Sequence, residues 1–427
     1  MILYHPSMQH NSGISRTTVL ALAAILNSTA VSQTKTESSS EQQSDRREAL
    51  ILGSLIGDAA GGPVEFVSHP DIAERGQPFR VWNPGERLEP ADLDKYGEEL
   101  ALLPYTIFRP APEPYAHWSA DAPAGTLTDD TRQKAITIDL FADAINADRT
   151  PESLGEIDFA RAYVRFMNAT VGTPTEHLAR KGLGEYEFAA QWVLGERDES
   201  RALPPSRLWG GLGTCAGQMA LPPVAAVFPG EPDRAYRLAY DIAFIDNARA
   251  RDTNAALVAG LAVALTTDPD DPDAWDTIKA AMRTTDPYRY ADVPWVHRGI
   301  NTWLDEAEQL ASDADREPAA LIAAIDERFA AGPWWDDRTI VVMTFAAIEL
   351  ASHHPLASIR LAIELGHDTD STAQLAGAFM GALHGLDIFP PGLADPVHAA
   401  LKSEHNATVE AWARITAALG KASEPNR

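Results

Sequence analysis

Residues 366–385 read GHDTDSTAQLAGAFMGALHG, an alanine- and glycine-rich run that begins with acidic and hydroxyl side chains. Its glycines at 377, 381 and 385 recur every four residues, so they line one face of a helix. Each glycine in an exposed helix costs about 1 kcal/mol relative to alanine, a cost that is offset where a second helix approaches to backbone contact. Residues 50–66, LILGSLIGDAAGGPVEF, carry the same spacing at Gly53, Gly57 and Gly61. The two segments therefore predict a closely packed central pair of helices.

The chain from Glu48 onward is helical in pattern nearly throughout. Apolar residues recur at three- and four-residue spacing, alanine is abundant, and no alternating run is long enough to propose a sheet. The segments with this pattern are Arg132–Ala147, Ile157–Met167, Asn254–Leu265, Pro318–Ala330, Thr339–Leu350, Leu356–Leu365 and Thr372–His384. We expect an all-α fold, a single compact orthogonal helical domain over residues 48–420, with a frayed tail over residues 421–427.

Composition and charge restrict the class of protein. The chain has 427 residues, of which 45% are hydrophobic and 22% charged, values typical of a globular protein with a sizeable core. Its net charge of −26 repels phosphate backbones, so we expect no binding to the backbone of a nucleic acid. The one cysteine, Cys215, excludes intrachain disulfides and a multi-cysteine metal cage. No apolar stretch approaches the roughly 18 residues that a membrane span requires.

The first 47 residues differ from the rest. Arg16 precedes the apolar run Val19–Leu26, and small residues follow as far as Ser32, which is the pattern of a secretory signal peptide. We therefore predict a signal peptide over residues 1–32 and a disordered polar linker over residues 33–47. The leader favours a periplasmic or extracellular protein. A disordered tail with one amphipathic patch is the alternative, and a misassigned translation start would leave the protein in the cytoplasm.

The first acidic segment is Thr128-Asp129-Asp130-Thr131, directly before the predicted helix at Arg132. Taken alone, it is most simply an N-cap, because threonine and aspartate satisfy free N–H groups and complement the helix dipole. One cap needs one side chain, however, and four consecutive oxygen-bearing residues occur here. Two adjacent aspartates repel each other unless a positive group lies between them and a partner.

A second acidic segment opens the other glycine-striped helix. In an extended loop the side chains of Asp368 and Asp370 point the same way, with Ser371 beside them. Capping explains one of these residues and not all three. Glu65 follows the first glycine-striped segment, at the end of a helix where the dipole does not favour an acid. Asp58, in that same segment, is a candidate for holding the loop in place or supporting the site from behind.

Together these segments offer hard oxygen donors without histidine or cysteine, at Thr128, Asp129, Asp130, Asp368, Asp370 and Ser371. Such a set suits Mg²⁺, Mn²⁺ or Ca²⁺ rather than zinc or copper. Four carboxylates around one divalent ion keep a charge of −2, whereas two ions neutralise them. A pair of cations about 3.5–4 Å apart is also the usual arrangement for activating water or binding a diol. We expect two Mg²⁺ (or Mn²⁺) ions in a site that forms only when the chain folds.

Three segments in this order resemble the signatures of the ADP-ribosylglycohydrolase (dinitrogenase-reductase-activating glycohydrolase-like) family: GSLIGDAAGGPVEF, LTDDTRQKA and GHDTDSTAQLAGAFMGALHG. The resemblance implies the all-α domain of that family, two Mg²⁺ or Mn²⁺ ions, and hydrolysis of the bond that joins ADP-ribose to a protein side chain or another acceptor. By position, the six oxygen-bearing residues above match the metal-binding positions. Glu65 matches an acidic position that in some members approaches a metal and acts at the active site.

The chain departs from the family pattern on the substrate side. His367 stands where the last signature usually has the second glycine of Gly-Gly-Asp. A middle segment with Met-Arg survives as Met219-Ala220, without its arginine, and a histidine common in the next helical region has no counterpart near Asp246. We count Gly366 and His367 among the substrate-binding candidates, although a structural role for His367 is favoured over a catalytic one.

Cleavage of a glycosidic bond passes through an oxocarbenium-like state that water must reach. A carboxylate beside the metal pair would take the proton of that water or supply one to the leaving group. We assign this work to Glu65, Asp129 and Asp130. Their individual roles stay open, because carboxylates that share a site titrate as a coupled set.

Aromatic residues are candidates for pocket walls. Tyr115 and Trp118 lie closest in sequence to Thr128 and rank first, with cover for the apolar surface as the alternative. The cluster at residues 334–338, WWDDR, either frames the cleft or caps the helix that follows, and capping is favoured. Trp209, among glycines, marks a ligand-facing loop or a turn.

Two other functions compete with an ADP-ribosyl hydrolase that acts on a small molecule or a modified protein. One is a binuclear-metal hydrolase of another nucleoside, glycoside or phosphoester. The other is a non-catalytic relative, against which the complete acidic set argues, because an unused cluster of buried like charges is costly. The sequence leaves the oligomeric state open.

Overall fold

The computed structural model describes residues 41–66, 79–104, 122–173, 176–247, 249–293 and 295–422. The chain divides into two units, Met1–Ser44 and Asp45–Arg427, and nearly all described residues belong to the second. These residues form helices and turns without a strand, which confirms the predicted all-α fold. Within the same ranges, no helix combines the length and the hydropathy needed to cross a membrane. The predicted signal peptide lies outside the described residues, as do Tyr115 and Trp118.

The first helix covers residues 41–61 and runs directly into the 3-10 helix η1 (Gly62–Val64). The elements that follow are η2 (Pro90–Asp92), α3 (Leu93–Glu98), α4 (Asp129–Asn146), η4 (Pro151–Ser153), α5 (Glu156–Thr170), α6 (Glu176–Val193), η5 (Pro205–Gly211), α7 (Ala216–Ala220), α8 (Pro222–Ala225), α9 (Pro232–Ile242), α10 (Ala250–Ala264), α11 (Ala274–Thr284), η6 (Tyr290–Asp292), α12 (Gly299–Asp313), α13 (Pro318–Arg328), α14 (Asp337–Leu350), α15 (Pro355–Glu364), α16 (Thr369–His384), η7 (Leu386–Ile388), α17 (Pro391–His405) and α18 (Val409–Lys421). Every segment predicted from apolar spacing lies in one of these helices, with ends that differ by a few residues.

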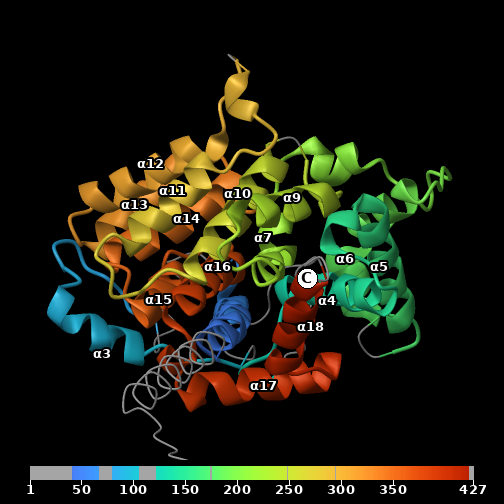
Figure 1. Ribbon diagram of the computed structural model, residues 1–427. Helices are drawn as coiled ribbons and strands as arrows, with labels where there is room; N and C mark the ends of the chain where they lie inside the picture. The colour runs from blue at the N-terminus through green and yellow to red at the C-terminus, as the bar shows by residue number, and fades with distance from the viewer. Residues whose placement is uncertain are drawn as a thin grey trace, which may run out of the picture. The chain divides into compact units, whose positions relative to one another are not determined.

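Helix α16 lies at the centre of the second unit, in contact with α15, α14, α10, α7 and α4 (Figure 1). Its glycine stripe faces the first helix at backbone contact. A Cβ atom at Gly57 would overlap the backbone carbonyl of Ala373, and one at Gly377 would overlap the carbonyl of Gly53. A side chain at Gly381 would meet the carbonyl of Ala49 in the same way. The predicted glycine-paired helices are therefore confirmed.

The described part of the first helix is already helical at residue 41, before the boundary predicted at Glu48, so residues 41–47 of the predicted linker are helical. The polar side chains at its end bind backbone groups elsewhere in the second unit. Arg46 Nη1 donates to the carbonyl of Thr267 at 2.5 Å, and Arg47 Nε donates to the carbonyl of Ala226 at 2.9 Å. Asp45 accepts from the backbone N–H of Leu386 at 3.1 Å. A polar composition such as that of residues 41–47 is typical of a solvated linker. These long-range hydrogen bonds fix the segment in the fold instead.

The ends of three elements define where a site can form. Helix α16 contacts both α4 and η1, so the N-terminal ends of α4 and α16 lie near the residue that follows η1. Thr369 Oγ1 donates to the carbonyl of Gly61 at 2.8 Å, which fixes the start of α16 to the end of the first helix. Through these contacts the fold brings together the three acidic segments that the sequence separates.

Candidate functional site

The loop before α4 is held from below by Asp58, which is fully buried on the first helix. Both oxygens of Asp58 accept from the backbone N–H of Thr128 at 3.2 Å, and one also accepts from Thr131 Oγ1. The hydroxyl of Thr128 accepts from the backbone N–H of Asp130 at 3.1 Å, as an N-cap does. Asp58 and Thr128 thus fix the backbone, which leaves the side chains of Asp129 and Asp130 available to the site.

The start of α16 also presents two carboxylates, from Asp368 directly before the helix and from Asp370 in its first turn. Asp368 is the N-cap residue of α16, yet its side chain makes no capping bond. Asp370 Oδ1 accepts from the backbone N–H of Ser371 at 2.9 Å, and Ser371 Oγ donates to Asp130 Oδ2 at 3.5 Å across the two loops. The two acidic segments therefore meet through their side chains.

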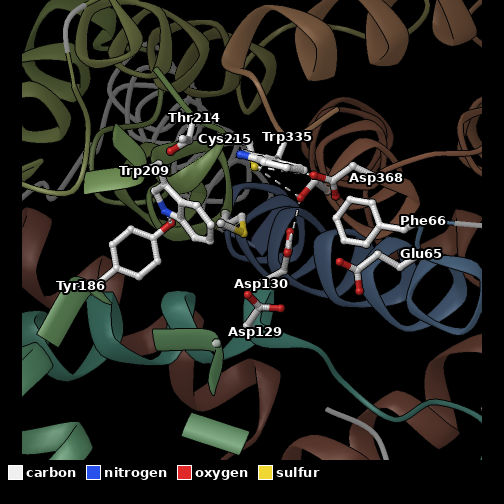
Figure 2. A pocket seen from close by; sticks show the side chains of 13 residues that line it. Glu65, Phe66, Asp129, Asp130, Tyr186, Trp209, Thr214, Cys215, Trp335 and Asp368 are labelled. Atoms are coloured by element: carbon white, nitrogen blue, oxygen red, sulfur yellow. Dashed lines mark hydrogen bonds between the residues drawn. The ribbon is translucent and has the colours of Figure 1, made fainter. Parts of the chain in front are cut away.

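The carboxylates form two groups of three that share one residue. One oxygen each from Glu65, Asp368 and Asp370 lies within 4.8 Å of the others, and so does one oxygen each from Asp129, Asp130 and Asp370. Figure 2 shows Glu65, Asp129, Asp130 and Asp368 directed toward one another from different segments of the chain. Asp370 is thus the residue that joins two adjacent positions at which a cation could bind.

Burial and mutual repulsion disfavour the ionised state of these side chains. Burial raises the pKa of Glu65, Asp130 and Asp370 well above the ordinary range, and the neighbouring carboxylates raise it further. The pKa of Asp368 rises to about 6, chiefly because the group is buried. Lys134 lies buried beneath them, and its Nζ donates to the backbone carbonyl of Asp130 at 3.2 Å. The site therefore has more acidic groups than Lys134 can balance, and their ionisation is costly unless a cation binds among them.

The residues of the site fit a divalent cation centre. Asp130 Oδ1 and Asp370 Oδ2 are buried and have no hydrogen-bond partner among the described residues, a costly state unless another group binds them. Every side-chain donor in the two groups is a carboxylate oxygen, the ligand type that Mg²⁺, Mn²⁺ and Ca²⁺ prefer. The acidic residues of the family's metal positions are thus brought together, while the hydroxyl of Thr128 is engaged in the cap of α4.

A cavity of about 110 Å³ opens over the carboxylates. It is lined by Glu65, Phe66, Asp129, Asp130, Gly182, Tyr186, Trp209, Thr214, Cys215, Met219, Trp335, Asp368 and Ser371. Its aromatic walls touch one another, because the rings of Trp209 and Trp335 have centroids 6.2 Å apart and the ring of Phe66 meets Trp335 edge-on at 6.2 Å (Figure 2). The pocket therefore combines an acidic floor with an aromatic rim.

Trp209 enters this rim from a strained turn. Its φ is +50°, and Gly210 and Gly211 continue with φ of +70° and +86°. The backbone N–H of Trp209 donates to Glu185 Oε1 at 2.9 Å, and its Nε1 donates to Tyr186 Oη at 2.9 Å. Of the two interpretations of this glycine-rich segment, the ligand-facing loop is the one that the geometry favours.

The other predicted binding residues have different positions. Gly366 and His367 do not line the cavity: the His367 ring stacks on Trp334, and its Nε2 is hydrogen-bonded to Asp326 Oδ1 at 2.6 Å. In the cluster at residues 334–338, Asp336 caps α14 by accepting from the backbone N–H of Arg338 at 3.0 Å. Trp335 lines the cavity, so this cluster both caps a helix and frames the site.

Helix α6 contributes one wall of the cavity, which the sequence did not predict. Gly182 and Tyr186 lie on this helix, and a Cβ at Gly182 would come within 3.3 Å of the Cβ of Asp129. Cys215, used in the sequence only to exclude disulfides, has its Sγ 3.8 Å from both Asp368 Oδ2 and Ser371 Oγ. The glycine at 182 is the one local signal that would have indicated a close approach.

Next to the pocket wall, the carboxylate of Asp337 is fully buried. Burial raises its pKa to about 7, and the nearby Asp336 and Asp246 oppose its ionisation, whereas Arg249, 3.1 Å from Oδ1, favours it. Since the folded state holds this proton more tightly than the unfolded state, the stability contribution of Asp337 is lost as pH rises from about 4 to about 7.

We therefore expect Asp337→Asn to be more stable than the wild type at pH 8, by about 1–2 kcal/mol after the loss of an Arg249 partner is allowed for. Urea unfolding of the metal-free protein at pH 5 and at pH 8 measures this difference, which should shrink at the lower pH. Reduced stability of the variant at pH 8 would mean that Asp337 is stabilised as an anion.

Fold and site together define a class: an all-α protein with a carboxylate centre at the N-terminal ends of two helices and an aromatic pocket above it. The chain belongs to the ADP-ribosylglycohydrolase family, whose family model matches residues 39–425. Among solved structures, an "ADP-ribosylglycohydrolase-related protein complex" is similar in fold, with a TM-score of 0.50 and 18% sequence identity over 90% of this chain and 100% of that chain. No curated protein matches this sequence.

Proposed function

We propose that this protein is a metal-dependent hydrolase that cleaves a ribosyl glycosidic or ester bond in an ADP-ribosylated protein or small molecule. Two Mg²⁺ or Mn²⁺ ions would occupy the carboxylate groups joined by Asp370. The observation that carries the proposal is this shared carboxylate, whose Oδ2 is buried and, in the ranges that the structure describes, has no hydrogen-bond partner. Family membership supports the glycohydrolase class.

The chain's own residues divide the work by position. Bound divalent ions would supply a Lewis acid that fixes ribose hydroxyls and polarises water. Asp129, Asp130, Asp368 and Asp370 would hold these ions, and Glu65, in the group with Asp368 and Asp370, would contact one of them as well. Glu65 is less buried than Asp368 and Asp370 and lines the cavity, so it is placed to exchange a proton with water or with the leaving group.

The aromatic rim serves the same reaction by excluding water. Phe66, Tyr186, Trp209 and Trp335 surround the opening above the carboxylates. A closed apolar wall strengthens electrostatic interactions inside the pocket and positions a planar or sugar-like group against the floor. Met219, on the same wall, adds an adaptable apolar contact.

A hydrolysis assay tests this function. Protein stripped of metal with EDTA is offered ADP-ribosyl-arginine, an ADP-ribosyl-serine peptide and a panel of nucleosides, each with Mg²⁺, with Mn²⁺ and without metal. We expect release of ADP-ribose only with metal, at a rate about 100-fold or more above the EDTA control. Equal rates in EDTA would refute the metal dependence, and release of a nucleobase instead of ADP-ribose would move the substrate to the nucleosides.

A further inference from the structure

His367 has an unusual backbone conformation beside the site. Gly366 and His367 have φ of +81° and +67°, a left-handed region that residues with a Cβ rarely occupy. This conformation turns the His367 carbonyl toward Phe66, whose backbone N–H donates to it at 2.6 Å. Phe66 also has a positive φ, of +56°. The backbone of His367 therefore holds the segment that carries Glu65 and Phe66 into the pocket.

The side chain of His367 binds a different segment. Its ring lies parallel to the ring of Trp334, with an interplanar angle of 6° and centroids 3.2 Å apart. Its Nε2 is hydrogen-bonded to Asp326 Oδ1, on α13, at 2.6 Å. A histidine placed in a disfavoured backbone conformation thus gains two specific side-chain contacts that a glycine there would lack.

The contact of the His367 carbonyl with Phe66 and the contact of its ring with Trp334 lead to two adjoining parts of the cavity wall. Trp334 is followed by Trp335, whose ring lines the pocket and whose carbonyl accepts from the backbone N–H of Cys215 at 3.0 Å. The Phe66 ring packs edge-on against Trp335, at an interplanar angle of 88°. The His367 ring thus stacks on Trp334, the next residue Trp335 packs against Phe66, and the backbone N–H of Phe66 is bonded to the His367 carbonyl. Each of these residues is held by two of the others.

We propose that His367 is a positioning residue that clamps two walls of the pocket, residues 65–66 through its carbonyl and residues 334–335 through its ring. In this role it sets the place of Glu65 and Trp335 over the carboxylate floor. The consequence for turnover rests on the proposed function, whereas the clamp itself is a property of the structure. A residue that only stabilised the fold would not act on the pocket selectively.

The chain offers a matched control for this role. His353 also has a positive φ, of +63°, and its Nε2 is hydrogen-bonded to a carboxylate, Glu349 Oε2, at 3.2 Å. Its ring lies against Trp275, with centroids 5.4 Å apart. His353 and Trp275 are not among the residues that line the cavity. His353→Gly therefore makes the same chemical change as His367→Gly at a place remote from the site.

The single cysteine, Cys215, allows the opening of the cavity wall to be measured. Cys215 is 3% exposed and lines the cavity beneath Trp335, so the rate at which N-ethylmaleimide alkylates it measures how often the wall opens. We expect His367→Gly to raise this rate about tenfold and His353→Gly to change it less than about twofold. Mn²⁺ affinity at the position formed by Asp129, Asp130 and Asp370, measured by calorimetry, should stay within about threefold of the wild type in both variants.

Hydrolysis of the substrate identified above gives the second readout. In His367→Gly we expect kcat to fall about tenfold or more, because Glu65 and Trp335 lose their fixed geometry. Trp334→Ala removes the same stacking without altering the loop at Asp368 and should reproduce both effects, while Trp334→Phe should restore most of each. This second pair keeps the test decisive if His367→Gly fails to fold.

The outcomes separate the clamp from the proposed function. Equal alkylation rates in His367→Gly and His353→Gly, or a loss of Mn²⁺ affinity in His367→Gly with unchanged alkylation, would overturn the clamp. A selective rise in alkylation without any hydrolysis by the wild type would support the clamp and refute the proposed function. A selective rise in alkylation with unchanged kcat would refute the positioning role in the reaction.

Discussion

Asp370→Asn is expected to abolish the binding of Mn²⁺ at both positions and to lower kcat/KM by about a thousandfold or more. Asp370 is the residue common to the two carboxylate groups, and within the described part of the chain its Oδ2 has no hydrogen-bond partner. The amide keeps the size of the side chain but offers a neutral and weaker ligand. Calorimetric titration of metal-free protein with Mn²⁺, followed by the hydrolysis assay, measures both effects.

Stability provides the control for this experiment. Burial, and after it the charges of Glu65, Asp130 and Asp368, raises the pKa of Asp370 well above its ordinary value. Removal of that charge relieves repulsion, so the metal-free variant should unfold at a higher urea concentration than the metal-free wild type. Asp395→Asn, an exposed aspartate on α17, should change neither metal binding nor stability. Full Mn²⁺ binding by Asp370→Asn would contradict the shared-ligand geometry.

Replacement of Glu65 tests whether the two metal positions can be emptied separately. Glu65 belongs only to the group with Asp368 and Asp370, so Glu65→Gln should lower the number of Mn²⁺ ions bound from two to one while the second group stays intact. Asp370→Asn, in contrast, should leave none. The stoichiometry from the same titration reads out this difference, and two ions bound by Glu65→Gln would assign Glu65 to catalysis without ligation.

The helices and the carboxylate floor could be predicted because their signals are local. Apolar spacing marks each helix within its own sequence, and a glycine stripe indicates the face that another helix approaches, as Gly57 and Gly377 do. Adjacent acids at Asp129 and Asp130 exceed what a helix cap needs, which indicated that a second acidic segment lay opposite. A site built from several carboxylates needs acidic residues in each contributing segment, and these residues are visible in the sequence.

The pocket walls could not be predicted, because they are made by contacts between distant segments. Tyr186 lies on an amphipathic helix with no polar motif, and it reaches the site only because α6 packs beside α5 and α4. Trp335 lines the cavity although its neighbours cap a helix. Proximity in sequence selected Tyr115 and Trp118, which lie outside the described residues. The clamp by His367 depends on Trp334 and Asp326. The cluster at residues 334–338 was a candidate to frame the cleft, but no local signal pairs it with His367.

Gly57→Ala is expected to lower the free energy of unfolding of the metal-free protein by about 3–4 kcal/mol, at the upper end of what overpacking costs. The added Cβ would overlap the carbonyl oxygen and carbon of Ala373 and the backbone nitrogen of Gln374. These atoms belong to the central helix α16 and cannot move away without breaking its own hydrogen bonds. Urea unfolding monitored by circular dichroism measures the loss.

Gly184→Ala is the matched substitution. Gly184 lies inside helix α6, and no atom of the described residues lies within 4 Å of an added Cβ, so alanine there should stabilise the protein by about 0.5–1 kcal/mol. Similar losses in both variants would mean that the glycines of the first helix are not needed for its approach to α16.

The overlap caused by Gly57→Ala should also weaken metal binding, although this substitution removes no metal ligand. The first helix ends beside Glu65 and α16 begins beside Asp370, so forcing the helices apart moves two members of one carboxylate group away from each other. Gly57→Ala should therefore bind Mn²⁺ about tenfold more weakly and be less stable, whereas Asp370→Asn should lose binding and gain stability. Opposite signs of the stability change in two variants that both lose metal would separate the packing of the helix pair from the charge of the site.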